Sequence, residues 1–126
     1  MAEPAAGAPR ATKIRLRTAE KTLEVEFADG ASFSLPAELL RVESPSAEVQ
    51  GHGPGQKTLI AGRRDVGIMK LEAVGNYAVR IFFDDLHDTG IYSWSYLYEL
   101  GANLQSRWND YLAALQAAEL SRDPRK

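Results

Sequence analysis

The chain has 126 residues, of which 44% are hydrophobic and 25% are charged, which is typical of one globular domain. Its net charge of −2 provides no basic face of the kind that nucleic-acid binding requires, and no apolar run is long enough to cross a bilayer. Without cysteine, the chain cannot form disulfides, thiolate metal sites or a cysteine nucleophile. The opening residues MAEPAAGAPRATK lack the apolar core of a signal peptide, so we expect a cytoplasmic protein that binds neither nucleic acid nor membrane.

Both ends of the chain are poor in residues that a core could bury. Residues 1–12 are mainly Ala, Pro and Gly, and residues 121–126 read SRDPRK. We expect disordered tails at 1–12 and 121–126, with a single domain over residues 13–120.

Three half-buried strands are predicted after the first tail, because apolar and polar residues alternate there. The alternating apolar residues are Ile14 and Leu16, then Leu23, Val25 and Phe27, then Phe33 and Leu35. A two-residue loop at Asp29-Gly30 would mix the faces of the last two strands. A three-residue loop over 28–30 pairs Val25 with Phe33 and keeps the apolar residues together. Gly30 then falls at the left-handed position that such a loop needs.

A short helix, PAELLR, is predicted to begin at Pro36, and residues 43–65 read as irregular. A second hairpin follows, in which Met69, Leu71 and Ala73 face Val79, Ile81 and Phe83. A loop over 74–76, with Asn76 in the left-handed conformation, keeps these residues on one face.

Two helices are predicted to end the domain. Ser93 or Ser95 can cap the first, which ends near Gly101, and Asn103 can cap the second. One side of the second helix is apolar, with Leu104, Trp108, Tyr111, Leu112 and Leu115 at helical spacing. We expect an α+β fold: antiparallel strands in two hairpin units, a short helix after the third strand, and two C-terminal helices packed on the sheet.

Residues 51–58, GHGPGQKT, come close to a phosphate-binding P-loop. Gly51, Lys57 and Thr58 fit that motif, but Gln56 replaces its second glycine. The flanking residues also lack the buried strand and the helix that a P-loop joins, so we interpret this segment as a surface loop.

His87 lies among Asp84, Asp85 and Asp88, and His52 is the second histidine of the chain. These residues could bind zinc or iron, but neighbouring strand residues point in opposite directions and a metal needs three or four converging ligands. The simpler interpretation is a solvated turn at the end of a strand.

Four aromatic residues, Tyr92, Trp94, Tyr96 and Tyr98, follow within a short stretch. These residues could simply belong to the core. Because they exceed what one helix face can bury, however, we expect some of the tyrosines to reach the surface, where they suit a protein contact. No arrangement of serine, histidine and acid that would indicate a hydrolase can be recognised by spacing.

Three segments resemble the gamma-butyrobetaine hydroxylase-like N-terminal domain. They are LLRVESPSAEVQGHGPGQ (39–56), VGIMKLEAVGNYAVRIFFDD (66–85) and HDTGIYSWSYLYELG (87–101). The resemblance implies kinship with small standalone bacterial proteins, with the front domain of carnitine-pathway hydroxylases, and with a version fused to a P-loop scaffold protein for iron–sulfur clusters. The resemblance implies no iron or 2-oxoglutarate chemistry for this chain, because in those hydroxylases that chemistry belongs to a separate catalytic domain.

The hydroxylase version of this domain holds a structural zinc through three cysteines and one histidine. The resemblance places the histidine at His87 and the cysteines at Ser44, Ser46 and Val49. Neutral hydroxyls and a valine cannot replace three thiolates, so the zinc does not carry over.

We expect a non-enzymatic accessory module that binds another protein and needs no cofactor. The resemblance suggests an unknown partner in iron–sulfur cluster assembly, or an oxygenase. The alternative is a metal-binding protein that holds zinc or iron through His87, Asp85 and the nearby acids or His52. A third hypothesis is an enzyme with a small-molecule pocket near His87.

Overall fold

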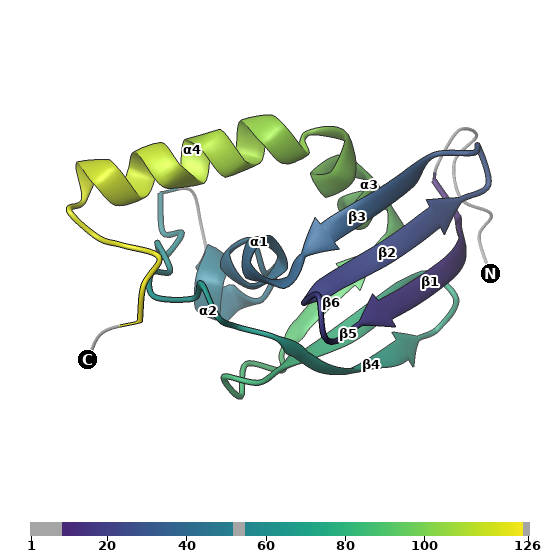
Figure 1. Ribbon diagram of the computed structural model, residues 1–126. Coiled ribbons are helices and arrows are strands. Elements are labelled where there is room, and N and C mark those ends of the chain that lie inside the picture. Colours follow the sequence, from purple (N-terminus) through teal and green to yellow (C-terminus); the bar gives the residue numbers. More distant parts are fainter. Residues whose placement is uncertain (1–8, 52–54, 125–126) are drawn as a thin grey trace.

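The computed structural model describes residues 9–51 and 55–124 (Figure 1). The first sheet contains β1 (Ala11–Arg17), β2 (Thr22–Phe27) and β3 (Ser32–Pro36), antiparallel and in chain order. The three-residue loop over 28–30 is confirmed, since Val25 pairs with Phe33 and Gly30 has a φ of +92°.

The second sheet contains β4 (Ile68–Val74), β5 (Ala78–Phe83) and β6 (Gly90–Ser93), again antiparallel and in chain order. The predicted loop over 74–76 is wrong. Ala73 pairs with Val79, so the loop is 75–77 and Gly75 takes the left-handed φ of +54°. A slip of two residues leaves every side chain on its predicted face, except that a register shift between Ile68 and Lys70 turns Met69 outward.

Strand β6 was not predicted, because its four residues run directly into a helix and its Gly90 reads as a bend. Gly90 pairs with Ile81, and Tyr92 with Val79. A Cβ at Gly90 would lie 2.6 Å from the Ser44 Oγ atom, so the strand approaches this serine too closely for any larger residue.

Four helices complete the described chain: α1 (Ala37–Val42), α2 (Ala47–Gln50), α3 (Trp94–Ala102) and α4 (Leu104–Ala117). The predicted short helix is present as α1, but it begins at Ala37, one residue later than predicted, because Pro36 is the last residue of β3 and occupies the N-cap position. Helix α2 is one turn within the segment predicted to be irregular. Ser93 caps α3, with its Oγ accepting from the Tyr96 N–H at 3.1 Å. Asn103 precedes α4 but does not cap it, since its side chain donates to the Glu99 carbonyl.

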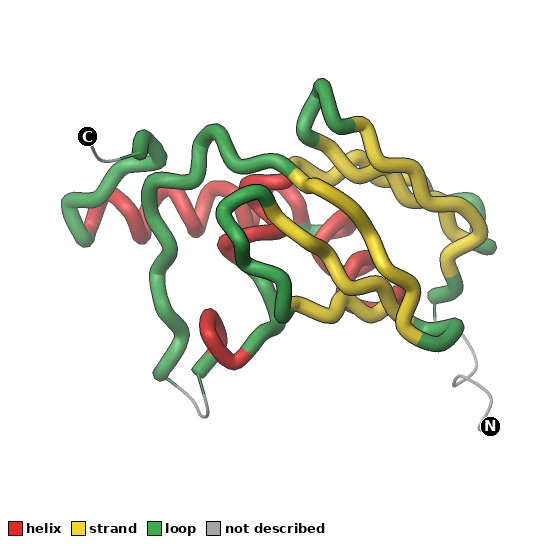
Figure 2. The backbone as a smooth tube through the Cα atoms, turned by 90° about the horizontal axis from the view of Figure 1, so that it is seen from below, coloured by secondary structure: helices red, strands yellow, loops and turns green. Residues whose placement is uncertain are grey.

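One core lies between the two sheets. Its most buried members include Val25, Leu35, Ile81, Phe83, Leu97 and Leu100, which come from both sheets and from α3. The last helix instead packs Tyr111 and Leu115 on Leu39 and Val42 of α1 (Figure 1). The α+β fold is therefore confirmed, with α4 covering α1 instead of a sheet. In the view from below, the strands lie in front of the helices (Figure 2).

The ends of the domain differ from the prediction. Strand β1 begins at Ala11, inside the stretch expected to be a tail, while residues 1–8 lie outside the described residues. At the other end, the Ser121 carbonyl accepts from the Gly62 N–H, and the Arg122 carbonyl accepts from the Arg64 N–H, both at 2.9 Å. Residues 121–124 therefore lie against the loop before β4. None of the described helices combines the length and the apolar character needed to cross a bilayer.

Candidate functional site

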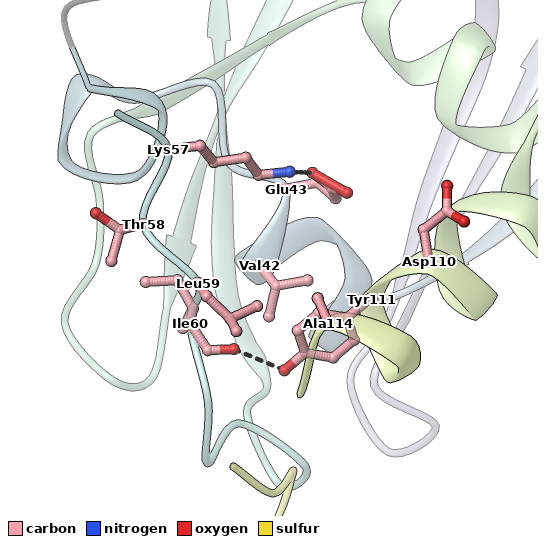
Figure 3. Close-up of a pocket in the computed structure, with 9 residues that line it drawn as sticks. All are labelled: Val42, Glu43, Lys57, Thr58, Leu59, Ile60, Asp110, Tyr111 and Ala114. Carbon is pink, nitrogen blue, oxygen red and sulfur yellow. Dashed lines mark hydrogen bonds and ion pairs between the residues drawn. The ribbon is translucent and has the colours of Figure 1, made fainter. Parts of the chain in front are cut away.

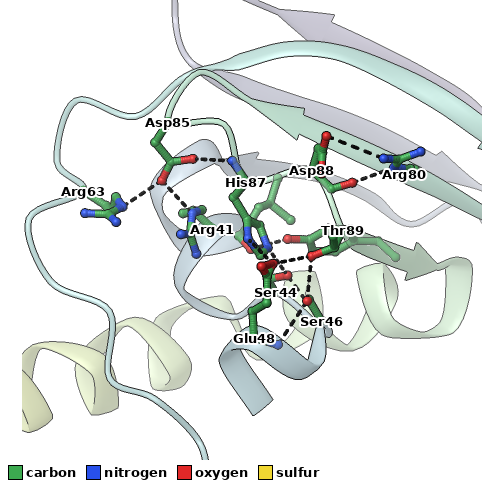
Figure 4. A network of polar contacts seen from close by, with 12 residues as sticks. Arg41, Ser44, Ser46, Glu48, Arg63, Arg80, Asp85, His87, Asp88 and Thr89 are labelled. Atoms are coloured by element: carbon green, nitrogen blue, oxygen red, sulfur yellow. Dashed lines mark hydrogen bonds and ion pairs between the residues drawn. The ribbon is translucent and has the colours of Figure 1, made fainter. Parts of the chain in front are cut away.

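His87 lies in a buried polar network between the end of β5 and the junction of α1 with α2 (Figure 4). Its Nε2 atom is 2.8 Å from the Ser44 Oγ atom, and its Nδ1 atom is 3.2 Å from a Glu48 carboxylate oxygen. A neutral imidazole that donates from Nδ1 to Glu48 accepts at Nε2 from the Ser44 hydroxyl. Burial lowers the pKa of His87, and the nearby positive charge of Arg41 lowers it further.

Asp85, the second predicted metal ligand, is engaged elsewhere. One carboxylate oxygen accepts from the Nε atoms of Arg41 and Arg63, each at 2.7 Å, and the other accepts from the His87 backbone N–H at 3.1 Å. Burial alone would raise the pKa of Asp85, but the hydrogen bonds from Arg41 and from the His87 backbone hold it below its ordinary value. Asp85 therefore anchors the turn after β5 to α1.

Of the remaining members of the network, Ser46 and Asp88 were considered in the sequence, whereas Glu48, Thr89 and Arg80 were missed. Thr89 donates to the Glu48 carboxylate at 2.6 Å, and its Oγ1 atom lies 2.7 Å from the Ser46 Oγ atom. Asp88 turns away from His87 and pairs with Arg80 at 3.6 Å. Because Thr89 lies 41 residues from Glu48 and 43 residues from Ser46 in the chain, no local spacing could have indicated these contacts.

The order Ser44, His87 and Glu48 is that of a serine hydrolase triad, an arrangement that the sequence spacing did not reveal. The surroundings of Ser44 nevertheless indicate that these three side chains hold the fold together and do not act on a substrate. The Ser44 side chain is fully buried at 0% exposure, its Oγ atom accepts from the Ser46 backbone N–H, and Gly90 packs against it. A substrate carbonyl has no route to such a hydroxyl.

The residues around His87 do not fit a zinc or iron site. In residues 9–51 and 55–124, no group of three or more His, Cys, Asp and Glu side chains is placed to hold a metal ion. Ser44 and Ser46 are committed to hydrogen bonds, and Val49 is buried in the core. His52, the other suggested ligand, lies outside the described residues.

The predicted protein-contact residues are held within the domain. Tyr92 is 0% exposed and its hydroxyl donates to the Leu40 carbonyl at 2.5 Å, so a contact role for Tyr92 is wrong. Trp94, Tyr96 and Tyr98 are half-buried. Their polar atoms donate to the Asn76 carbonyl, the Glu43 carbonyl and the Asp29 carboxylate, respectively.

Exposed apolar residues gather instead on the second sheet and its loops. Four of the six exposed large apolar residues of the described chain lie there: Met69 (62% exposed), Tyr77 (57%), Leu86 (83%) and Ile91 (47%). The other two, Leu112 and Leu120, lie on α4 and just after it and are less exposed. Cross-strand pairing places Lys70 beside Phe82 and Arg80 beside Ile91 on the outer face of this sheet. No pattern in the sequence indicates this surface, because strand alternation places Met69 inside and the turn around Leu86 reads as polar.

A separate groove of about 320 Å³ lies between residues 57–60 and α4 (Figure 3). Its walls are mainly apolar, and the Tyr111 hydroxyl donates to the Ile60 carbonyl at 2.7 Å. Lys57, the lysine of the P-loop-like segment, pairs with the buried Glu43, and Asp110 adds a second acid to the lining. These carboxylates make the groove a poor phosphate site.

Comparisons with known proteins identify relatives. The family model described as "Gamma-butyrobetaine hydroxylase-like, N-terminal" matches residues 14–98. One NMR solution structure is 47% identical, with a TM-score of 0.83 over 95% of this chain and 94% of that one. A second is 46% identical, with a TM-score of 0.81 over 98% and 92%.

A crystal structure of a protein of unknown function, assigned to the DUF971 family and from Acidithiobacillus ferrooxidans ATCC 23270, is also similar. It is 35% identical, with a TM-score of 0.63 over 74% of this chain and 93% of that one. No curated protein matches the chain.

Proposed function

This chain belongs to the gamma-butyrobetaine hydroxylase-like N-terminal family, and we propose that it is a non-enzymatic accessory module that binds another protein. The resemblance to domains fused to oxygenases and to an iron–sulfur scaffold protein favours a partner in one of those two classes.

The observation that carries this proposal is the outer face of the second sheet. Both α3 and α4 lie away from it, and it presents Met69, Leu86 and Ile91 to solvent around the half-buried Phe82. Exposed apolar side chains grouped on one face and rimmed by charges are typical of protein-binding surfaces.

The non-enzymatic part of the proposal is supported by the state of the polar network. Its one serine with a histidine partner, Ser44, is sealed in the core, and Asp85 is neutralised by two arginines. Neither group is available to a substrate, as a catalytic nucleophile or base must be.

Site-specific photo-crosslinking in living cells tests the proposal. A photo-reactive amino acid at Met69, on the proposed surface, is compared with one at Gln116, an exposed position of α4. We expect a discrete adduct of higher mass from position 69 that is absent from position 116. If position 69 gives no adduct, or the same adducts as position 116, the second sheet is not the binding surface.

A further inference from the structure

We propose that a groove at one end of this face, the Leu86 groove, receives an apolar side chain of the partner together with a neighbouring carboxylate. The groove has a volume of about 330 Å³ and is lined by Met69, Lys70, Phe82, Phe83, Leu86 and Asp88. This inference rests on the proposed function and adds the chemistry of the partner.

The first step concerns the backbone at Leu86. This residue has a φ of +73°, in the left-handed region that favours glycine, yet its side chain is 83% exposed. Leucine at such a position costs stability and gains no burial in return within this chain. Strain of this kind persists where the surrounding structure enforces it, and it indicates a functional role for the side chain.

The second step concerns the rigidity of the turn that carries Leu86. The Leu86 N–H donates to the Phe83 carbonyl at 3.1 Å, and the Phe83 N–H donates to the His87 carbonyl at 3.0 Å. Asp85 is clamped by Arg41 and Arg63 (Figure 4). The turn therefore presents Leu86 in a fixed position, which reduces the entropy lost when a partner binds.

The third step concerns charge. The Lys70 ammonium and the Arg80 guanidinium each lie 4.5 Å from the centre of the Phe82 ring. Arg80 also pairs with Glu72 and Asp88, whereas Lys70 has no carboxylate partner among the described residues. A partner carboxylate placed beside the groove would form an ion pair with Lys70, while an apolar side chain of the partner would contact Phe82 and Leu86.

These three observations favour a short segment of a partner protein with one apolar residue flanked by Asp or Glu. A basic segment would place its charge against Lys70, which is unfavourable at the rim of an apolar contact.

Peptide titrations of the full chain labelled with ¹⁵N test this inference by NMR. The probe is a nine-residue peptide with a central leucine flanked by glutamates in an alanine background. One control peptide has lysines for the glutamates, and a second has alanine for the leucine. We expect the glutamate peptide to shift the amide resonances of residues 69–70 and 82–88. The lysine peptide should bind about threefold to fivefold more weakly, the size expected of one partly exposed ion pair.

Two variants complete the test. Lys70→Glu should reverse the preference, so that the lysine peptide binds more tightly than the glutamate peptide. Leu86→Gly should abolish the shifts while keeping a melting temperature at or above that of the natural chain, because glycine accepts a positive φ without strain. Equal binding of both charged peptides, unchanged binding to Leu86→Gly, or no shifts with any peptide would overturn the inference.

The crosslinking experiment separates this inference from the proposed function. If an adduct forms at position 69 but Lys70→Glu and Leu86→Gly leave it intact, the module binds a protein without the chemistry proposed for the groove. If no adduct forms at position 69, the second sheet is not the binding surface, and the proposed function loses the observation that carries it.

Discussion

At the scale of single residues, Ser44 is a fully buried polar group with several partners. Its hydroxyl contacts the His87 Nε2 atom at 2.8 Å and accepts from the Ser46 backbone N–H, while Gly90 leaves it no free space. A buried group of this kind specifies how the turn after β5 meets α1, because its partners cannot be satisfied in any other arrangement.

We predict that Ser44→Ala lowers the free energy of unfolding by about 1–3 kcal/mol, because it leaves the buried His87 Nε2 atom without a partner. Urea denaturation measures the change. Ser34→Ala, at an exposed position of β3, is the matched control and should change the stability by less than about 0.5 kcal/mol. Equal losses in the two variants would show that the Ser44–His87 contact contributes nothing.

The pKa of His87 gives a second prediction. Burial and the charge of Arg41 lower this pKa in the folded chain, so the unfolded chain binds the proton more readily. The contribution of His87 to stability is therefore complete above its unfolded pKa of about 6.5 and is lost as the pH falls through the lower folded pKa.

The measurement uses two proteins that both carry His52→Gln, so that His87 is the only histidine in the first. The second also carries His87→Gln. We expect the free energy of unfolding of the first protein to fall more steeply between pH 7 and pH 5 than that of the second. Parallel curves would contradict the lowered pKa.

The donor set around His87 gives a third prediction, which bears on the metal-binding alternative. Ser44 and Ser46 offer neutral hydroxyls, and Asp85 is held by Arg41 and Arg63. We expect mass spectrometry of untagged protein to find no stoichiometric zinc or iron, and a chelator to leave the melting temperature unchanged. Stoichiometric metal in the natural chain that disappears in His87→Ala would establish a metal site instead.

At the scale of elements, the alternation of apolar and polar residues predicted the strands and the faces of the two hairpins, which depend on residues close together in the chain. The first hairpin was correct because the faces of Val25 and Phe33 allowed only one loop length. The second hairpin slipped by two residues, since both registers keep the same faces and only the turn residue, Gly75 in place of Asn76, distinguishes them. Strand β6 was missed because it is short, runs directly into α3 and begins at a glycine that reads as a bend. The C-terminal segment was missed because its partners around Gly62 and Arg64 lie far away in the chain.

The C-terminal segment shows what such distant partners contribute. Arg122 makes two hydrogen bonds, of 2.9 Å and 2.7 Å, to the carboxylate of Glu38, which is buried in α1. A paired arginine and carboxylate in this geometry is stronger than an ordinary ion pair, and loss of the arginine leaves a buried charge uncompensated.

We predict that Arg122→Ala lowers the free energy of unfolding by about 1–3 kcal/mol, a range reduced from that of fully buried pairs because Arg122 is partly exposed. Thermal or urea unfolding measures the loss. Arg64→Ala, which removes an exposed pair with Asp123, is the matched control and should cost less than about 1 kcal/mol. If the two variants lose the same stability, the C-terminal segment is not anchored through Glu38.

At the scale of the whole molecule, the candidate site exists only because both halves of the chain meet. Asp85 and His87 were predicted to lie together, since they are neighbours in the sequence. Their partners Arg41, Ser44 and Glu48 come from α1, α2 and their junction, and tertiary packing alone brings them within hydrogen-bonding distance. The exposed face of the second sheet could not be predicted either, because exposure is a property of what the rest of the fold leaves uncovered.

Helix α3 joins the two sheets, and its approach to the first sheet depends on Gly101. A Cβ at this position would lie 2.2 Å from the Cγ atom of Phe33, whose ring packs against Phe27 and Tyr98. Alanine is favoured over glycine within a helix by about 1 kcal/mol, so the helix alone would gain from the substitution. The clash acts in the opposite direction, because a packed aromatic cluster cannot yield without moving the helix.

We predict that Gly101→Ala lowers the free energy of unfolding by about 1–2 kcal/mol, since overpacking costs outweigh the gain in helix propensity. A double-mutant cycle with Phe33→Ala is the control. Once the Phe33 ring is removed, Gly101→Ala should become neutral or stabilising, which gives a coupling free energy of about 1–3 kcal/mol between the two positions. If Gly101→Ala has the same effect with and without the ring, Gly101 does not determine how α3 docks on the first sheet.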